Sequence, residues 1–425
     1  MNDQARSVQR TYLILMLGNT LAASFIWGIN TLFLLDAGLS NFQAFGANAF
    51  FTAGMVLFEI PTGVVADTAG RRLSYQLGTI TLAVSTALYY ALWVIHGPFA
   101  LWAIVSMLLG LGFTFFSGAV EAWLVDALHH ASYEGTLETV LGRGQMVSGV
   151  AMLGGSVLGG FVAQQTSLGV PFLMRVGVLL IMFVVASKLM FDQGFEPESH
   201  ATPLKAVRRT LDASITHGLK HPPVRWMMLS APFTAGVGFY TFYALQPYLL
   251  NLYGTPKAYT VAGLAAALVA LAQIVGGALA PKIRGLFAKR TTALIVFSVA
   301  TIAVMVGIGL APSFWMALAL CAAWGLLFAA AMPIRQAYVN DMIPSKQRAT
   351  VLSFDSLMGS AGGAVVQPVL GRSADVYGYG TSFVVGAAIQ VLAVPFLLLS
   401  RRQRSPADEG RAGGESPPAQ TPVTT

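Results

Sequence analysis

Long runs of uncharged residues recur along the whole chain, and they restrict its possible folds more than any other feature. Each run is roughly 20 residues long, the length that an α-helix needs to cross the hydrocarbon core of a bilayer. Only 10% of the residues are charged, against about 25% in a soluble domain, and 55% are hydrophobic. The sequence therefore predicts an all-α integral membrane protein, because helices satisfy their own backbone hydrogen bonds in lipid.

Twelve membrane-spanning helices are expected, arranged as two parallel-related bundles of six. The expected spans are residues 11–35, 43–63, 73–95, 99–128, 138–165, 170–191, 226–252, 258–281, 290–311, 313–342, 349–370 and 380–400. We divide the chain into an N-terminal six-helix bundle (1–192), a cytoplasmic linker (193–225), a C-terminal six-helix bundle (226–400) and a disordered cytoplasmic tail (401–425). A surface helix is expected in the linker near residues 204–219.

The positions of the basic residues indicate the orientation in the membrane. When alternate loops are assigned to the cytoplasm, those loops and the two ends of the chain hold twenty of the 25 Lys and Arg residues, whereas the opposite loops hold Lys257 and Arg372. Both termini of this multi-pass protein are therefore expected in the cytoplasm, with the plasma (inner) membrane as its location. Because the basic residues are dispersed over short loops, the net charge of +7 does not indicate nucleic-acid binding.

The two halves of the chain repeat one another. Residues 110–126 align without gaps on residues 325–341, and five of these seventeen positions are identical, including Asp126 and Asp341. Parallel six-helix repeats are typical of transporters whose substrate site lies near the bilayer midplane between the halves.

A ten-residue motif, Gly63-Val-Val-Ala-Asp67-Thr-Ala-Gly70-Arg71-Arg72, separates the second and third expected spans. It resembles the loop between the second and third helices of the major facilitator superfamily, and the resemblance extends over residues 11–400. The resemblance implies that Gly63, Asp67, Gly70, Arg71 and Arg72 form a cytoplasmic gate, in which Asp67 meets the positive end of the eleventh span. The alternative is that Asp67 is an ordinary turn aspartate.

Several ionisable residues lie within the expected spans, where each charge costs roughly 2.5–3.5 kcal/mol on insertion scales. Glu121 on the fourth span and Arg335 on the tenth have two interpretations. In one they face a shared cavity, with Glu121 as proton acceptor and Arg335 as its counter-charge or a substrate clamp. In the other they form a structural charge pair, or Arg335 snorkels to the surface. Glu59 and Asp355 are further candidates for proton coupling, and Arg175 enters the sixth span from the outside.

Polar and aromatic residues of three spans form a candidate substrate pocket, because the superfamily resemblance implies that spans 1, 4, 7 and 10 line the cavity. With Glu121 and Arg335, the candidates are Asn19, Trp27, Asn30, Thr114, Ser117, Tyr240, Tyr243 and Gln246. Such an apolar and aromatic cavity with few polar groups suits a lipophilic organic compound better than a sugar or a small ion. Each of these residues could equally be a helix-packing contact.

The fifth span contains Gly155-Ser156-Val-Leu-Gly159-Gly160, which resembles the G-P-x-x-G-G signature of the twelve-span drug:proton antiporters, with Ser156 in place of proline. A second departure from that group is Ser106, where its members usually carry an arginine on the fourth span. The glycines alone could serve close helix packing. The resemblance favours proton-coupled efflux of a small hydrophobic organic compound, a drug or secondary metabolite, by alternating access.

Other functions remain open at this point. Symport or uniport uptake of a small metabolite is the nearest alternative, and a non-transporting receptor or scaffold on the same fold is another; a channel fits less well because no ring of like residues is evident. The sequence contains no P-loop lysine motif and predicts neither an enzyme nor a cofactor. His129 and His130 form a loop pair rather than a metal site. The expected partners are a small-molecule substrate, protons and the lipid bilayer, and the expected state is a monomer.

Overall fold

The structure is a computed structural model that describes residues 3–116, 118–195, 219–343 and 348–409. Every regular element in these ranges is helical. Three expectations lie outside the described residues: the role of Ser117, the linker helix near 204–219, and the disorder of most of the tail expected at 401–425. Residues 401–409 of that tail are described; they end the last α-helix and form a 3-10 helix, and Asp408 among them is buried.

The first half of the described chain supplies the expected spans one to six. Its helices are α1 (Asp3–Trp27), α2 (Asn30–Asp36), α3 (Asn41–Ala69), α4 (Arg71–Ile95), α5 (Phe99–Thr114), α6 (Ala119–His130), α7 (Leu137–Gln165) and α8 (Val170–Leu189). The first span is broken, since α1 and α2 meet at a bend of 46°. The fourth span is α5 followed by α6.

The second half supplies the expected spans seven to twelve. Its helices are α10 (Pro222–Tyr253), α11 (Tyr259–Arg284), α12 (Arg290–Gly309), α13 (Phe314–Met342), α14 (Arg348–Val391) and α15 (Ala393–Arg402), followed by the short 3-10 helix η3 (Pro406–Asp408). The long α14 is kinked at Gly378, where φ is 81°. This kink falls between the expected spans 349–370 and 380–400.

Nine helical stretches of the described residues are long and apolar enough to cross a bilayer, and the bent pair α1–α2 makes ten. One of the nine, Phe354–Arg402, contains both spans on either side of the Gly378 kink. α10 is not among the nine, and it carries Pro232 and Pro247, but it lies where the seventh span is expected. Each expected span therefore falls on helical residues: the first and the fourth each on a pair of helices, the eleventh on α14, and the twelfth on the end of α14 and α15.

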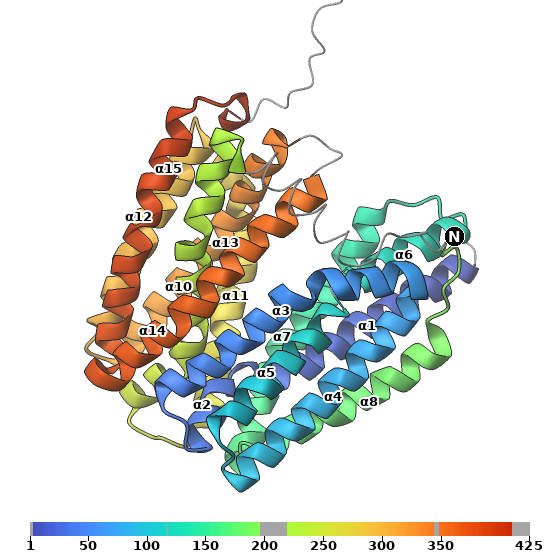
Figure 1. The fold of residues 1–425 in the computed structure, drawn as a ribbon, viewed down its shortest axis with the longest axis horizontal. Helices are drawn as coiled ribbons and strands as arrows, with labels where there is room; N and C mark the ends of the chain where they lie inside the picture. Colours follow the sequence, from blue (N-terminus) through green and yellow to red (C-terminus); the bar gives the residue numbers. More distant parts are fainter. Residues whose placement is uncertain (1–2, 117, 196–218, 344–347, 410–425) are drawn as a thin grey trace, which may run out of the picture.

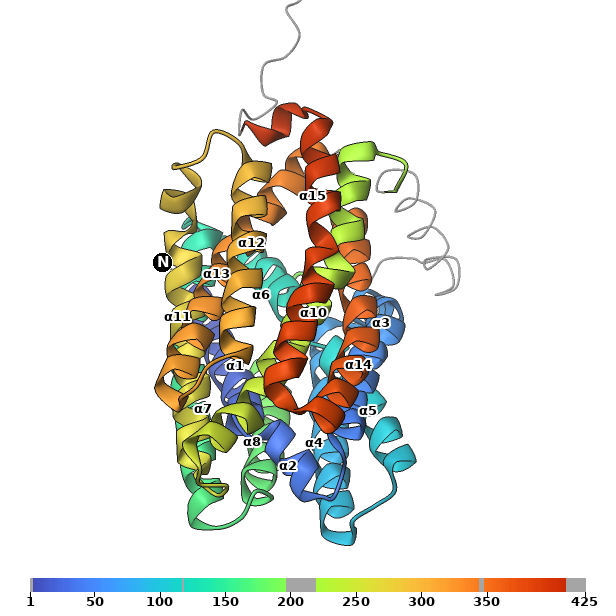
Figure 2. The same ribbon diagram turned by 90° about the vertical axis from the view of Figure 1, so that its left-hand side faces the viewer.

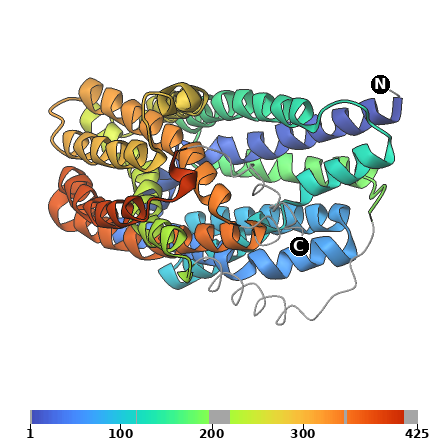
Figure 3. The same cartoon turned by 90° about the horizontal axis from the view of Figure 1, so that it is seen from above.

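The helices form two groups that lie side by side, one from residues 3–189 and one from residues 222–402 (Figure 3). We call them the N half and the C half. They contact each other mainly through α3 with α14 and through α7 with α11. Figure 2 shows α3 next to α14 from the side.

Each half has its own apolar core, built from interlocking aromatic side chains. In the N half, Phe33 stacks on Phe172 with ring centroids 3.8 Å apart, and Trp102 is fully buried beside them. In the C half, Phe383 packs against Tyr248 and Tyr240. Large apolar side chains also cover the outside of the helices, which is the pattern of a surface that faces lipid.

The two ends of the molecule differ. α1 begins and α15 ends on one side, which we call the termini side; the junction of α3 with α4 is also there. The turns at 37–40, 96–98, 166–169 and 254–258 lie on the other side, which we call the loop side. The two halves lie against each other on the loop side, and their helices diverge toward the termini side (Figure 1).

Candidate functional site

An aspartate of the C half caps a helix of the N half on the loop side. The backbone N–H groups of Asn41 and Phe42, the first two residues of α3, donate to the Asp375 carboxylate at 2.8 and 2.9 Å. Ser40 caps the next N–H of the same helix end from within the N half, since its hydroxyl accepts from the Gln43 N–H. A carboxylate at a helix N-terminus satisfies unpaired N–H groups and complements the helix dipole. Asp375 therefore joins the two halves at the start of α3.

Further hydrogen bonds between the halves lie on the same side. The Gln246 side chain of α10 donates to the Trp27 carbonyl at 2.7 Å and accepts from the Thr31 N–H at 2.9 Å, so it bridges to the break between α1 and α2. Tyr379 donates its hydroxyl to the side chain of Asn41. Because Gln246 is buried, its two bonds satisfy backbone groups that water does not reach at this break.

Glycines allow α7 and α11 to approach closely near the loop side. A Cβ atom added at Gly160 of α7 would lie 2.4 Å from the Tyr259 carbonyl oxygen of α11, and one added at Gly263 would lie 2.5 Å from the Ser156 carbonyl oxygen of α7, so neither residue can carry a side chain in this arrangement. Gly155 and Gly159 of the same motif lie against α1, at Ser24 and Phe25. In this conformation the antiporter-like glycine motif therefore packs three helices together across the two halves.

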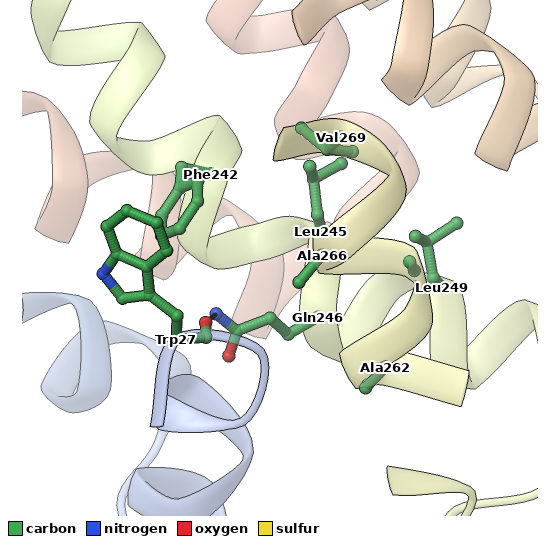
Figure 4. Close-up of a pocket in the computed structure, with 9 residues that line it drawn as sticks. Trp27, Phe242, Leu245, Gln246, Leu249, Ala262, Ala266 and Val269 are labelled. Carbon is green, nitrogen blue, oxygen red and sulfur yellow. Dashed lines mark hydrogen bonds between the residues drawn. The ribbon is translucent and has the colours of Figure 1, made fainter. Parts of the chain in front are cut away.

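A cavity lies where the end of α1 meets α10 and α11, and it contains about 340 Å³ of empty space including its open part (Figure 4). It is almost entirely apolar. Figure 4 shows the Trp27 indole and the Phe242 ring on one side and the aliphatic side chains of α10 and α11 on the other. Gln246 is its polar group. Two of the residues expected to bind substrate, Trp27 and Gln246, line this cavity together.

The other expected pocket residues have partners elsewhere. Asn19 accepts from the Tyr75 hydroxyl at 2.7 Å, and Asn30 donates to the Asn48 side chain at 3.1 Å, both within the N half. Thr114 bonds its own helix at the Leu111 carbonyl. Tyr240 is fully buried and shares a hydrogen bond with Ser382. In this conformation their polar atoms serve helix packing.

Arg335 is neutralised by Asp355. Its Nη2 atom donates to the Asp355 carboxylate at 2.6 Å and to the Met227 carbonyl at 3.1 Å, and its Nη1 atom donates to the other oxygen of Asp355. Only 8% of the Asp355 side chain is exposed. The pair joins α13, α14 and α10 within the C half, so the counter-charge of Arg335 in this conformation is Asp355 and not Glu121.

The two glutamates have different surroundings. Glu121 lies in the first turn of α6 and is exposed. Glu59 is half-buried on α3 and interacts with neighbouring groups.

The ten-residue motif Gly63–Arg72, which the resemblance assigns to a gate, makes its contacts within the N half in this conformation. Arg71 forms an ion pair with Asp67 and lies 3.9 Å from the carboxylate of Asp126. Gly70 has a φ of 108°, a left-handed value that favours glycine at the junction between α3 and α4. Gly63 lies about two helical turns before Gly70, and a Cβ atom added there would meet open space. The ion pair of Asp67 in the described chain is with Arg71, and α14 diverges from the motif on this side.

Asp192 is a further contact of the motif, and sequence reasoning missed it. Its carboxylate accepts from the Arg72 N–H at 2.9 Å, while the Arg72 guanidinium donates to the Ser187 carbonyl and stacks over Phe191. Burial raises the pKa of the Asp192 carboxyl, and the bond from Arg72 and the charges of both arginines oppose this shift. Asp192 thus ties the end of the sixth span to the start of the third.

Asp375 was missed as well, although a signal was present. It is an acidic residue in the short turn that the sequence predicts between the eleventh and twelfth spans, three residues after Arg372, although the structure places it within α14. Its partner, the N-terminus of α3, could not be identified from the sequence. The two residues are more than 330 positions apart, and only the fold brings them together.

Two groups of apolar helices that meet at one end, with ionisable residues inside their expected spans, define a polytopic membrane protein with the architecture of a secondary transporter. The chain matches the family model described as Major Facilitator Superfamily over residues 12–308 and 285–424. It therefore belongs to the major facilitator superfamily. Members of this family, and the structures most similar to this one, are transporters rather than enzymes, and the chain is a multi-pass membrane protein.

Solved structures of three transporters share the fold. The nucleoside transporter NupG (D323A mutant) superposes with a TM-score of 0.77 at 12% identity, covering 92% of this chain and 99% of NupG. A bacterial homolog of the human lysosomal transporter Spinster, in an inward-facing and unoccupied conformation, gives 0.69 at 17% identity, with 94% and 98% covered. A D-xylose-proton symporter gives 0.64 at 16% identity, with 92% and 96% covered. A comparison with curated proteins found no match.

Proposed function

We propose that this member of the superfamily is a secondary active transporter that exports a small, largely hydrophobic organic compound in exchange for protons. One observation carries the alternating-access part of the proposal. The hydrogen bonds of Asp375 and Gln246 join the halves on the loop side, while the helices diverge on the termini side. A transporter that opens to one side at a time has this asymmetry in each of its end states.

The proposed orientation places both termini in the cytoplasm and the protein in the plasma membrane, following the distribution of basic residues. The described conformation is then open to the cytoplasm. The proposed cytoplasmic gate, formed by Gly63, Asp67, Gly70, Arg71 and Arg72, is released in this state. In the outward-open state Asp67 would leave Arg71 and hold the N-terminus of α14, in the same way that Asp375 now holds the N-terminus of α3.

Among the candidates for proton coupling, Asp355 is favoured by its buried two-point contact with Arg335. Protonation of Asp355 would remove the negative charge from a buried two-point ion pair and release Arg335. Because Arg335 also bonds the Met227 carbonyl of α10, its release would loosen the contact of three helices of the C half. Protonation can shift the conformational equilibrium only through such a difference between the two states.

Inverted membrane vesicles with an imposed pH gradient test the proposal. Vesicles with an acidic interior should accumulate a lipophilic fluorescent dye, and vesicles containing the Asp355→Asn variant at equal protein level should not. If dye movement is the same with and without a gradient in both, proton coupling is wrong. If neither Asp67→Asn nor Asp355→Asn changes any transport, a non-transporting scaffold is favoured.

Proton-coupled uptake of a small polar metabolite is the second candidate, since the D-xylose-proton symporter and the nucleoside transporter NupG share the fold. The same vesicles separate the two directions. Export moves the substrate into inverted vesicles when protons move out, whereas symport moves both in the same direction. The apolar lining of the cavity in Figure 4 favours export of a hydrophobic compound over a sugar.

A further inference from the structure

Arg175 lies in the second turn of α8, on the face of that helix that packs inward. Phe172, Leu179 and Met182 of α8 are buried, and Arg175 falls between them at helical spacings of three and four residues. Leu173, Leu180 and Ile181 of the same helix are exposed and form its outer face. The guanidinium therefore lies toward the interior of the molecule and not toward lipid.

The charge of Arg175 has no acidic partner among the described residues. Its Nε atom is buried without a hydrogen-bond partner. Tyr243 on α10 and Tyr89 on α4 are titratable residues near enough to act on its charge, neither is acidic, and the Tyr89 hydroxyl shares a hydrogen bond with Ser106 at 2.5 Å. Arg335 is different, since Asp355 binds it at two points. A charged side chain inside a membrane protein is costly, and one without a partner requires another reason to be there.

Tyr243 connects Arg175 to the cavity of Figure 4. The Tyr243 ring packs edge-on against Phe242 with centroids 5.3 Å apart, and Phe242 packs in the same way against Trp27 at 5.7 Å. Phe242 and Trp27 line the cavity. Trp27 of the N half and Phe242 and Tyr243 of the C half thus form a row of aromatic side chains that leads from the cavity toward Arg175.

We propose that Arg175 binds an anionic group of the transported substrate, and that the substrate is an organic anion whose apolar body lies against Trp27 and Phe242. A guanidinium offers two parallel N–H groups that match a carboxylate. Ligand binding supplies the missing counter-charge and removes the cost of the isolated cation. This inference rests on the proposed function, because it names the substrate class of the same cavity.

Binding of 2-naphthoate and of 2-naphthamide to the purified full-length chain tests the inference. The two probes share one ring system and differ in charge. Isothermal titration should show wild type binding the carboxylate at least tenfold more tightly than the amide. Arg175→Gln should bind both equally, and Tyr243→Phe should keep the preference for the anion. Arg372→Gln, which removes an exposed arginine on the loop side, is the matched control and should behave as wild type.

The melting temperature of the ligand-free protein gives a second, probe-independent result. If Arg175 is an uncompensated charge that awaits its ligand, Arg175→Gln leaves the melting temperature unchanged or raises it. A clear fall would identify Arg175 as a structural residue and overturn the inference. It is also overturned if wild type shows no preference for naphthoate, or if Arg175→Gln retains that preference. Intact naphthoate binding in a protein that moves no compound across vesicles would instead overturn the proposed function.

Discussion

Removal of the Asp375 carboxylate should open the loop side. The carboxylate accepts two backbone N–H groups at the start of α3, at 2.8 and 2.9 Å, and both halves of the molecule meet there. Loss of an N-terminal cap costs about 0.5–2 kcal/mol. Because the hydrogen bond from the Phe42 N–H is exposed to water, the expected loss of closure free energy in Asp375→Ala is about 1–2 kcal/mol, below the value for buried hydrogen bonds to charged groups. The ratio of open to closed loop side should then rise about 5–30-fold.

Electron–electron distance measurements between spin labels can detect this shift. Cysteines at Ile95 and Leu310, which are 66% and 70% exposed and lie at loop-side helix ends of the two halves, carry the labels. The native Cys321 is buried and should not be labelled. A population with a longer label separation should grow in Asp375→Ala and not in Arg372→Gln.

Ser40→Ala provides the matched control, since it weakens the same end of α3 from within the N half. Both substitutions should lower thermal stability slightly, but only Asp375→Ala should change the label separation. If Ser40→Ala and Asp375→Ala give the same distance distribution as wild type, the carboxylate does not hold the halves together, and the described closure depends on the helix contacts alone.

Three further predictions follow from the contacts. Gly160→Leu should hinder the approach of α7 to α11 and lower the population with a closed loop side in the same distance measurement. Gly154→Leu places its side chain in open space and should leave that population unchanged. Equal effects of the two substitutions would show that the contact of α7 with α11 at Gly160 does not limit closure. Asp355→Asn and Arg335→Gln should each destabilise the protein by roughly 3–5 kcal/mol, because each leaves the other charge buried without its partner. In a double-mutant cycle measured by thermal unfolding, the double variant should lose clearly less stability than the sum of the two single losses; additive losses would argue against a direct pair. Gln246→Leu should leave the Trp27 carbonyl and the Thr31 N–H without hydrogen-bond partners, at a cost of roughly 1–3 kcal/mol each. The Thr31 amide should then exchange its hydrogen faster than in wild type; an unchanged exchange rate would mean that water replaces the Gln246 side chain.

Patterns that depend on nearby residues predicted the fold well. Apolar run length placed each expected span on helical residues, because a bilayer demands a fixed length of apolar helix wherever the chain crosses it. It did not show the breaks between α1 and α2 and between α5 and α6, or that α14 runs from the eleventh expected span into the twelfth. The gate and glycine motifs were recognised for the same reason, since their residues are adjacent in the chain. The kink at Gly378 also fell in the expected turn.

The candidate site was predicted only in part. Trp27 and Gln246 do line one cavity, but Asn19, Asn30 and Tyr240 bond to other groups in this conformation. Helical spacing shows which residues share a face, and it does not show which helix that face meets. For this reason Arg335 was paired with Glu121 in one interpretation, whereas the structure pairs it with Asp355.

The sequence by itself determined that this protein lies in lipid and where along the chain its apolar helices fall, because both depend on composition and spacing within one segment. The tertiary structure decided which charges have partners and which side of the molecule is closed. Asp375 is far from Asn41 in the chain, and Gln246 is far from Trp27. Their interactions depend on how two separately folded groups of helices lie against each other, and no local pattern encodes that geometry.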